Sequence, residues 1–172
     1  MSAVSRAIEM QEYKDRFIAG KVMRDCCTGE NLKMWTRAMS DPIDVSGECM
    51  FMGSKFQFNL EIKERNKTDR QLQQYPHAEL RVDKFKRMID KTENGVNLLY
   101  MVLLNEKTCY LYNLTNINWK KVTTFDWEVK KTEMAYNSDR KVYPIYQIPF
   151  SLAFLTMDCT KYYQEYYKNY GD

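Results

Sequence analysis

The segment from Lys55 to Glu64 alternates between apolar and polar residues along its whole length. The apolar positions are Phe56, Phe58, Leu60 and Ile62, and the polar positions are Gln57, Asn59, Glu61 and Lys63. Successive side chains of a β-strand point to opposite faces, so this alternation predicts a strand with one face in the core. Ile43 to Met52 is expected to form the partner strand, because Gly53-Ser54 suits a two-residue type II′ turn.

Helical and strand patterns alternate along the rest of the chain. We expect helices at Ser2–Asp25, Glu79–Lys91 and Ser151–Tyr170, strands at Lys33–Arg37, Val96–Leu104, Thr108–Tyr112 and Lys141–Phe150, and a loop at Asn66–His77. Thr115–Arg140 has no clear pattern. The 172 residues suffice for one sizeable core. We therefore expect a single domain over residues 1–172 with an α/β fold, in which helices flank a mixed β-sheet.

The composition excludes several classes of site. Five cysteines without a C-x-x-C pair, together with one histidine, argue against a structural zinc site and favour reduced, mostly buried thiols. No apolar run approaches the roughly 20 residues that a membrane span requires, and no signal peptide is evident, so we expect no membrane partner and a cytoplasmic location. The net charge of +3 permits an anionic partner only if the basic residues are clustered.

The predicted hairpin brings charged residues to one face. A turn at Gly53-Ser54 places Asp44 opposite Lys63 and Ser46 opposite Glu61. Directly opposed residues share a face, so Asp44, Glu61 and Lys63 project from the side away from the apolar row. A bulge at Gly47 would move Asp44 to the other face, and Asp41 would then be the competing acid.

Two neighbouring carboxylates repel one another, and a divalent cation relieves that repulsion. Mg²⁺ prefers oxygen ligands and keeps several waters, so one or two carboxylates suffice to bind it. A bound cation of this kind lowers the pKa of a coordinated water and neutralises charge on phosphate. Lys63 is placed to position or deprotonate such a water. The alternative is a solvated strand face with an ordinary Glu–Lys arrangement.

Asp44, followed after sixteen residues by Glu61-Ile62-Lys63, resembles the D…(D/E)-x-K core of the PD-(D/E)XK nuclease superfamily. The order of elements over roughly residues 5–112 is similar too, as is the E-I-K-E-R-N extension of small endonuclease-like members from phages and mobile elements. One departure is that Pro42 does not directly precede the acid, since the order is Asp41-Pro42-Ile43-Asp44.

The resemblance implies a restriction-endonuclease-like fold, a Mg²⁺-dependent endonuclease (with Mn²⁺ as a substitute), DNA as the partner and a homodimer as one assembly. Asp44 and Glu61 would bind metal, and Lys63 would serve the water and the scissile phosphate. Glu9 is the favoured third metal ligand from the first helix, with Glu12 and Glu30 as rivals. The residues expected to contact DNA are Lys84, Arg65, Arg81 and Arg87. The alternative is a catalytically inactive protein of the same fold that binds nucleic acid or protein.

A second group of basic residues surrounds Trp127. Lys120-Lys121 and Lys130-Lys131 flank the segment that contains this tryptophan. Basic residues interleaved with aromatic ones can line a channel for a nucleic-acid strand. The same pattern also fits a solvated surface, which the sequence favours here.

Overall fold

The computed structural model describes residues 3–26, 31–51, 53–129 and 141–171 of the chain. The helices are α1 (Ala3–Cys26), α2 (Asp69–Gln74), α3 (Val82–Asp90) and α4 (Thr160–Tyr170). The strands are β1 (Lys33–Thr36), β2 (Val45–Phe51), β3 (Ser54–Arg65), β4 (His77–Arg81), β5 (Asn97–Leu104), β6 (Thr108–Asn113), β7 (Thr123–Val129), β8 (Lys141–Pro149) and β9 (Leu155–Asp158). Short 3₁₀ helices occupy Trp119–Lys121 and Phe150–Leu152.

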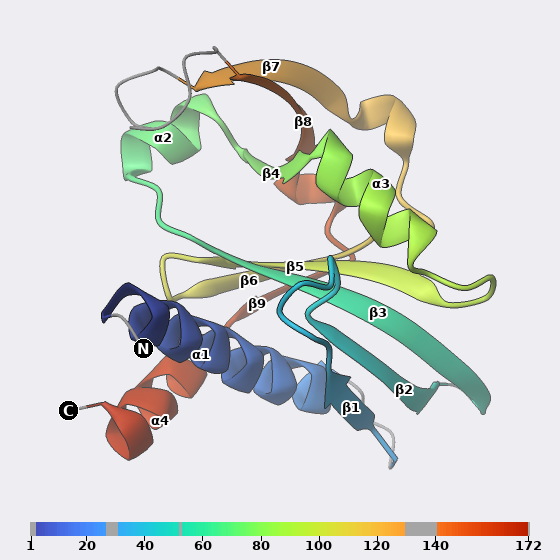
Figure 1. Ribbon diagram of the computed structural model, residues 1–172, viewed down its shortest axis with the longest axis vertical. Coiled ribbons are helices and arrows are strands. Elements are labelled where there is room, and N and C mark those ends of the chain that lie inside the picture. Colours follow the sequence, from blue (N-terminus) through green and yellow to red (C-terminus); the bar gives the residue numbers. More distant parts are fainter. Residues whose placement is uncertain (1–2, 27–30, 52, 130–140, 172) are drawn as a thin grey trace.

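The strands of these ranges form two sheets in separate layers. Six of them make a mixed sheet in the order β1-β2-β3-β5-β6-β9, in which β3 and β5 are parallel and the other neighbours antiparallel. The other three make an antiparallel sheet in the order β4-β8-β7. Figure 1 shows α1 and α4 on one face of the large sheet, and α3 with the small sheet on the other. The expected α/β fold, a mixed sheet flanked by helices, is therefore confirmed.

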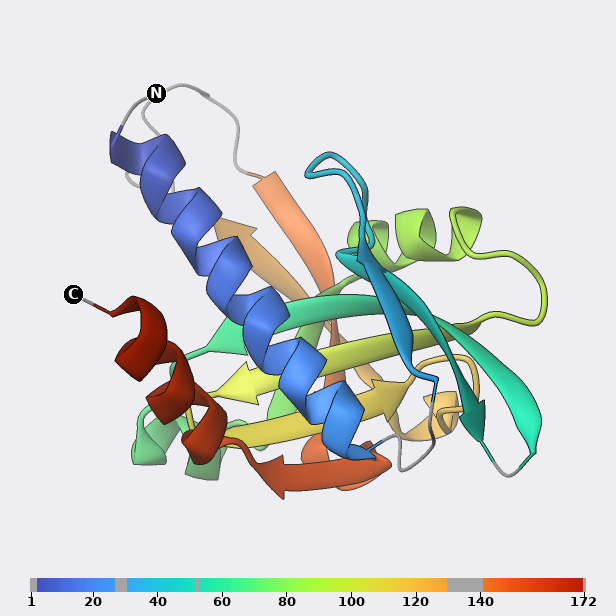
Figure 2. The same ribbon diagram turned by 90° about the horizontal axis from the view of Figure 1, so that it is seen from below.

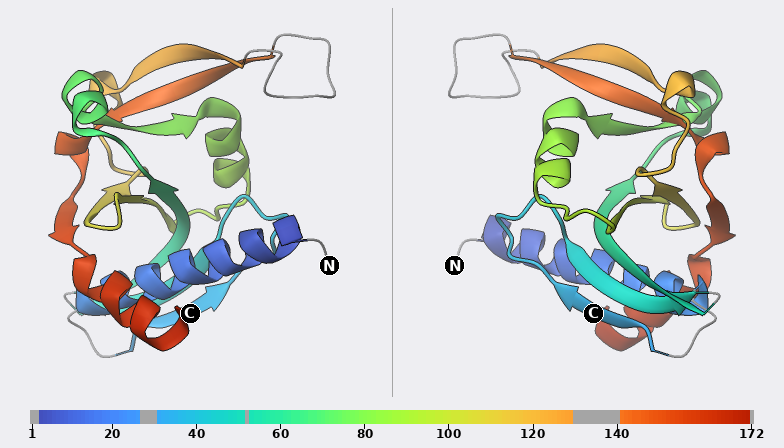
Figure 3. Two further views of the ribbon diagram at one scale, coloured as in Figure 1. Left: turned by 90° about the vertical axis from the view of Figure 1, so that its left-hand side faces the viewer. Right: turned by 90° about the vertical axis from the view of Figure 1, so that its right-hand side faces the viewer.

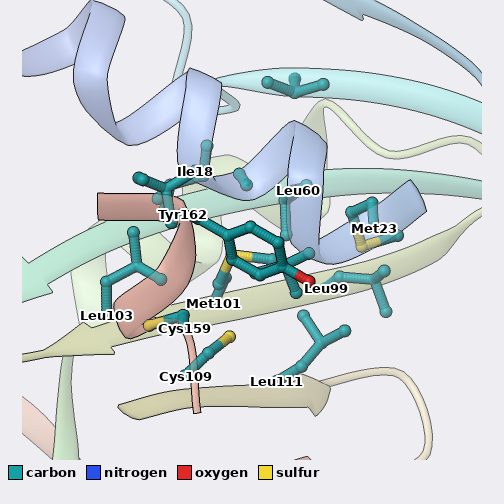
Figure 4. Packing of buried hydrophobic residues seen from close by; sticks show 14 of the residues in the cluster. Ile18, Met23, Leu60, Leu99, Met101, Leu103, Cys109, Leu111, Cys159 and Tyr162 are labelled. Atoms are coloured by element: carbon teal, nitrogen blue, oxygen red, sulfur yellow. The ribbon is translucent and has the colours of Figure 1, made fainter. Parts of the chain in front are cut away.

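The apolar row of the alternating segment lies in the core as predicted. Phe58, Leu60 and Ile62 are buried, and Phe56 packs at the edge of the same cluster. Figure 4 shows Leu60 together with side chains of α1, α4 and the neighbouring strands, among them Ile18 and Tyr162. Removing such apolar area from water is the main contribution that fixes α1 and α4 against this face.

The middle of the polar row, Asn59 and Glu61, is buried as well, because α3 and the small sheet cover this part of the face, whereas Gln57 and Lys63 at either end are exposed. Ser46 donates a hydrogen bond to Asn59 Oδ1 (2.7 Å), and Asn59 Nδ2 donates to Thr92 Oγ1 (3.1 Å). Buried polar groups need such partners, since an unpaired one costs free energy of desolvation. Glu61 lies two residues further along the same face and is also buried.

The hairpin register differs from the predicted one by two residues. Phe51 lies opposite Ser54 and Val45 opposite Leu60, so the turn does not sit at Gly53-Ser54. Asp44 consequently lies beside Glu61 rather than opposite Lys63. A shift of two positions leaves every side chain on its predicted face, because the side-chain period of a strand is two. The pairing of β2 with β3 is continuous through Gly47, so the bulge considered from the sequence is absent from this described stretch.

Gly47 is required by close packing within this hairpin. An added Cβ would lie 2.4 Å from Cζ of Phe58 and 2.8 Å from the backbone oxygen of Lys33. We expect Gly47→Ala to lower the free energy of unfolding by about 1 to 3 kcal/mol, as overpacking does in other cores. Denaturant titration measures this change. Gly20→Ala is the matched control, because nothing lies within 4 Å of its added Cβ and alanine favours the helix.

Three element predictions are wrong in part, and each has a local cause. The expected loop at 66–77 contains α2, which begins with a capping box between Thr68 and Gln71. Residues 77–81 pair with β8 as strand β4, so the expected helix at 79–91 begins only at Val82. The expected helix at 151–170 is confined to α4, because residues 155–158 pair with β6 as strand β9.

The cysteines of the described ranges are mostly buried, as expected. Cys49, Cys109 and Cys159 are buried, and Cys26 is half-buried. Cys27 lies outside the described residues. No helix in the described part of the chain is both long and apolar enough to cross a membrane.

Candidate active site

Asp44, Glu61 and Lys63 lie together on the face of the large sheet that α3 covers. All three line one cleft of about 730 Å³, with residues from α1, from the segment before β2 and from α3. Figures 2 and 3 show the N-terminal half of α1, the loop at residues 37–44 and the β7–β8 ribbon extending to the same side of the molecule. The spatial convergence that the hairpin pattern predicted is therefore present.

Asp44 is held in place by the backbone of β3. Its amide donates to the carbonyl oxygen of Leu60 (3.1 Å), and its Oδ2 accepts a hydrogen bond from the amide of Ile62 (2.7 Å). These two bonds continue the hairpin ladder by one residue and orient the carboxylate beside Glu61.

Asp41 also lines the cleft, but its carboxylate is engaged elsewhere. Its Oδ2 accepts hydrogen bonds from Arg37 Nη2 (2.9 Å) and Nε (3.2 Å), and its Oδ1 accepts from the amide of Ile43 (2.9 Å). The Asp41 carboxylate therefore stabilises the local turn between Arg37 and Ile43. The geometry favours Asp44 over Asp41 as the acid that accompanies Glu61.

Glu61 is a buried carboxylate with one oxygen unsatisfied. Its Oε1 lies 2.9 Å from Nζ of Lys84, whereas the buried Oε2 has no hydrogen-bond partner within the described ranges. Burial, and after it the neighbouring charge of Asp44, raises the pKa of Glu61 to about 8. A second cation beside Asp44 would supply the missing partner and remove the repulsion between the two acids.

Lys63 lies two residues further along β3 and reaches the solvent of the cleft. Its pKa is lowered, first by partial desolvation and then by the positive charges of Arg65 and Lys84. A lysine with a lowered pKa gives up its proton more readily than an ordinary surface lysine. The chemistry available here is therefore proton transfer to or from a nearby ligand.

Glu9 of α1 does not lie where the sequence placed it, beside Asp44 and Glu61. Glu9 is exposed and is not among the residues that line the cleft, whereas Glu12 lines it. Asp15, one turn further along, lines the cleft too and was missed from the sequence. Burial, and then Glu64, raises the pKa of Asp15 to about 7. Glu30 lies outside the described residues.

Across the described part of the chain, no group of three or more acidic, histidine or cysteine side chains is close enough to enclose a metal ion. Asp44 and Glu61 therefore form a pair that no third acid among the described residues of the cleft joins closely. Mg²⁺ is compatible with so few protein ligands, because it keeps several of its waters and shares its remaining positions with a substrate.

The predicted basic residues gather beside this centre. Lys84, Arg65, Arg81 and Arg87 all line a smaller hollow of about 180 Å³, which also contains Glu61 and Lys63. Arg65 and Lys84 border both hollows, so the two are neighbours across β3 and α3. The chain has only a small net positive charge, so it can bind an anion only where basic residues are clustered. These four residues form such a cluster.

Comparisons with known proteins give one structural likeness to report. No family model matches the chain, and no curated protein matches it. A solved structure described as the Holliday junction resolvase Hjc of Archaeoglobus fulgidus, an archaeal hyperthermophile, aligns with a TM-score of 0.43 and 11% identity. The alignment covers 88% of this chain and 98% of the resolvase chain.

Proposed function

We propose that the protein is a Mg²⁺-dependent nuclease of the PD-(D/E)XK type that hydrolyses DNA phosphodiester bonds internally. The observation that carries the proposal is the pair Asp44 and Glu61, fixed side by side with Oε2 of Glu61 buried and unpartnered among the described atoms. Lys84 neutralises only one of the two carboxylates, so the arrangement remains costly until a second cation binds.

Asp44 and Glu61 are the residues that would hold the ion. Asp44 offers its Oδ1, since its Oδ2 is occupied by the amide of Ile62, and Glu61 offers the unpartnered Oε2. Glu12 and Asp15 face the same cleft from α1 and are the acids best placed to act through bound water. A divalent ion at this position supplies Lewis acidity and lowers the pKa of water.

Lys63 is proposed to act on the attacking water. Its lowered pKa increases the fraction of neutral amine, which can accept a proton as the water oxygen bonds to phosphorus. The charged amine can instead stabilise the developing negative charge on the phosphate. Hydrolysis breaks the phosphorus–oxygen ester bond and leaves a phosphate and a hydroxyl.

The basic residues are proposed to hold the sugar–phosphate backbone. Lys84, Arg65 and Arg87 line the hollow next to the acid pair, and such contacts position a strand without reading its sequence. Affinity should accordingly fall as salt increases.

Cleavage of supercoiled plasmid with Mg²⁺ or Mn²⁺, and its loss in excess chelator, tests the proposal. We expect Lys63→Ala to lower the cleavage rate by a factor of roughly 10² to 10⁴, the range typical of general acid–base groups. Lys63→Arg should recover only the part of the rate that depends on the positive charge of the side chain, because arginine does not give up its proton. Lys55→Ala is the matched control, because Lys55 lies on the same strand and face but pairs with Glu48 away from the cleft. Wild-type cleavage that persists in chelator contradicts the proposal.

A binding module without catalytic activity is the second candidate. The contact between Lys84 Nζ and Glu61 Oε1 (2.9 Å) favours it, because an ammonium in this place neutralises the acid without any metal. Isothermal titration separates the two functions. A nuclease should bind Mn²⁺ saturably and lose that binding in Asp44→Ala, whereas a module of the second kind should show no saturable binding.

A further inference from the structure

The β7–β8 ribbon carries aromatic side chains on the face that it shares with Arg81 of β4. Trp127 lies opposite Tyr143, and Phe125 lies opposite Ile145, so these four residues share one face of the small sheet. Trp127 is 48% exposed and Phe125 54% exposed. A ligand that covers such large aromatic side chains removes their apolar surface from water, which is favourable.

Arg81 connects this aromatic face to the candidate active site. It lies opposite Ile145 on the neighbouring strand β4, and its guanidinium stacks 4.1 Å from the centre of the Tyr143 ring. Arg81 also lines the hollow that contains Glu61 and Lys63. Arg81 therefore joins the hollow that contains Glu61 to the ring of Tyr143, and Trp127 lies opposite Tyr143. Two hydrogen bonds to Asp83 hold Arg81 in this position (2.9 and 2.6 Å).

The combination of cations and exposed rings fits one class of ligand. A phosphate backbone needs cations, and unpaired bases offer flat surfaces that stack on aromatic side chains. Bases inside a duplex are already stacked on each other and present only their edges. The Trp127–Tyr143 face thus matches a single strand better than a duplex.

We propose that the Trp127–Tyr143 face binds unpaired nucleotides, so that the substrate is DNA with a single-stranded segment next to the cleaved bond. This inference rests on the proposed nuclease function, whose substrate it specifies. The backbone of the unpaired strand runs through the hollow of Lys84 and Arg81, and its bases stack on the ribbon. Figure 3 shows this ribbon extending beyond α3, on the same side as the N-terminal half of α1.

Fluorescence anisotropy in chelator tests this proposal without any cleavage. The probes are a blunt duplex, the same duplex with an overhang of about ten nucleotides, and one whose overhang is abasic. We expect tighter binding to the normal overhang than to the other two. Trp127→Ala should weaken overhang binding roughly tenfold, the order of one lost stacking contact, and leave blunt-duplex binding unchanged. Trp127→Phe should retain most of the preference.

Trp35→Ala is the matched control, because Trp35 is 48% exposed as well but lies on β1, outside both hollows. It should leave all three affinities unchanged. Equal wild-type affinity for blunt, overhanging and abasic DNA overturns the proposal, as does overhang binding that Trp127→Ala leaves intact. Overhang binding through Trp127 without cleavage in Mg²⁺ would retract the nuclease function and leave this binding face standing.

Discussion

Glu61→Gln is expected to reduce metal-dependent DNA cleavage by about a thousandfold or more while the protein remains folded. Glutamine keeps the shape of the side chain but removes the charge that, next to Asp44, makes the site attractive to a cation. Loss of metal-assisted charge stabilisation worth about 4 kcal/mol corresponds to this factor. Plasmid nicking under single-turnover conditions measures the rate, and circular dichroism shows whether the fold is intact.

Glu48→Gln is the control for this experiment. Glu48 lies on the same hairpin and the same face as Asp44, but at the far end, where it pairs with Lys55 (2.7 Å). Its removal should leave cleavage within about twofold of wild type, since surface ion pairs contribute little. Cleavage by Glu61→Gln at the wild-type rate would falsify the assignment of the acid pair as the metal centre.

Folding stability without metal is expected to fall as the pH rises from about 5 to 9, and Glu61→Gln should remove a large part of that fall. The pKa of Glu61 is about 8 in the folded chain, against an ordinary value of 4.5. The folded state therefore holds the proton more tightly than the unfolded state. The resulting stabilisation is fully present below about pH 4.5 and is lost as the pH rises through 8. A shift of this size corresponds to a few kcal/mol, on the order of 1.4 kcal/mol per pH unit.

Urea titration of wild type and Glu61→Gln at pH 5 and pH 9, both in chelator, measures this difference. Comparing the two variants is necessary because Asp15, with a pKa of about 7, changes wild-type stability in the same direction. Saturating Mg²⁺ should flatten the wild-type profile, since a bound cation replaces the proton and stabilises the folded state. Parallel profiles for the two variants in chelator would show that Glu61 does not hold its proton as the structure indicates.

The sequence predicted the faces of the hairpin correctly while placing its turn wrongly. Phe58, Leu60 and Ile62 point into one core and Glu61 and Lys63 point away from it, as the alternation requires. The register is shifted by two residues, a change that the period of a strand cannot detect. Pairing across a turn depends on the contacts of both strands, and these include β1 and β5 on either side.

Elements that follow the hairpin were less predictable. β4 and β9 are short strands of five and four residues that exist because β8 and β6 lie beside them. Local pattern carries little information about such pairing, since the partner is distant in the sequence. The capping box at Thr68 was a local signal for α2, and it was available from the sequence.

The sequence by itself determined that two acids and a lysine share one face of a stiff hairpin, because the alternation of a strand is a local property. Only the tertiary structure decided that α3 and the small sheet bury Glu61 on this face, which leaves it with an unpartnered oxygen among the described atoms and a raised pKa. It also decided that Glu12 and Asp15, rather than Glu9, face the cleft. The physical reason is that burial and helix rotation depend on packing between distant segments, and no periodicity within one segment encodes them.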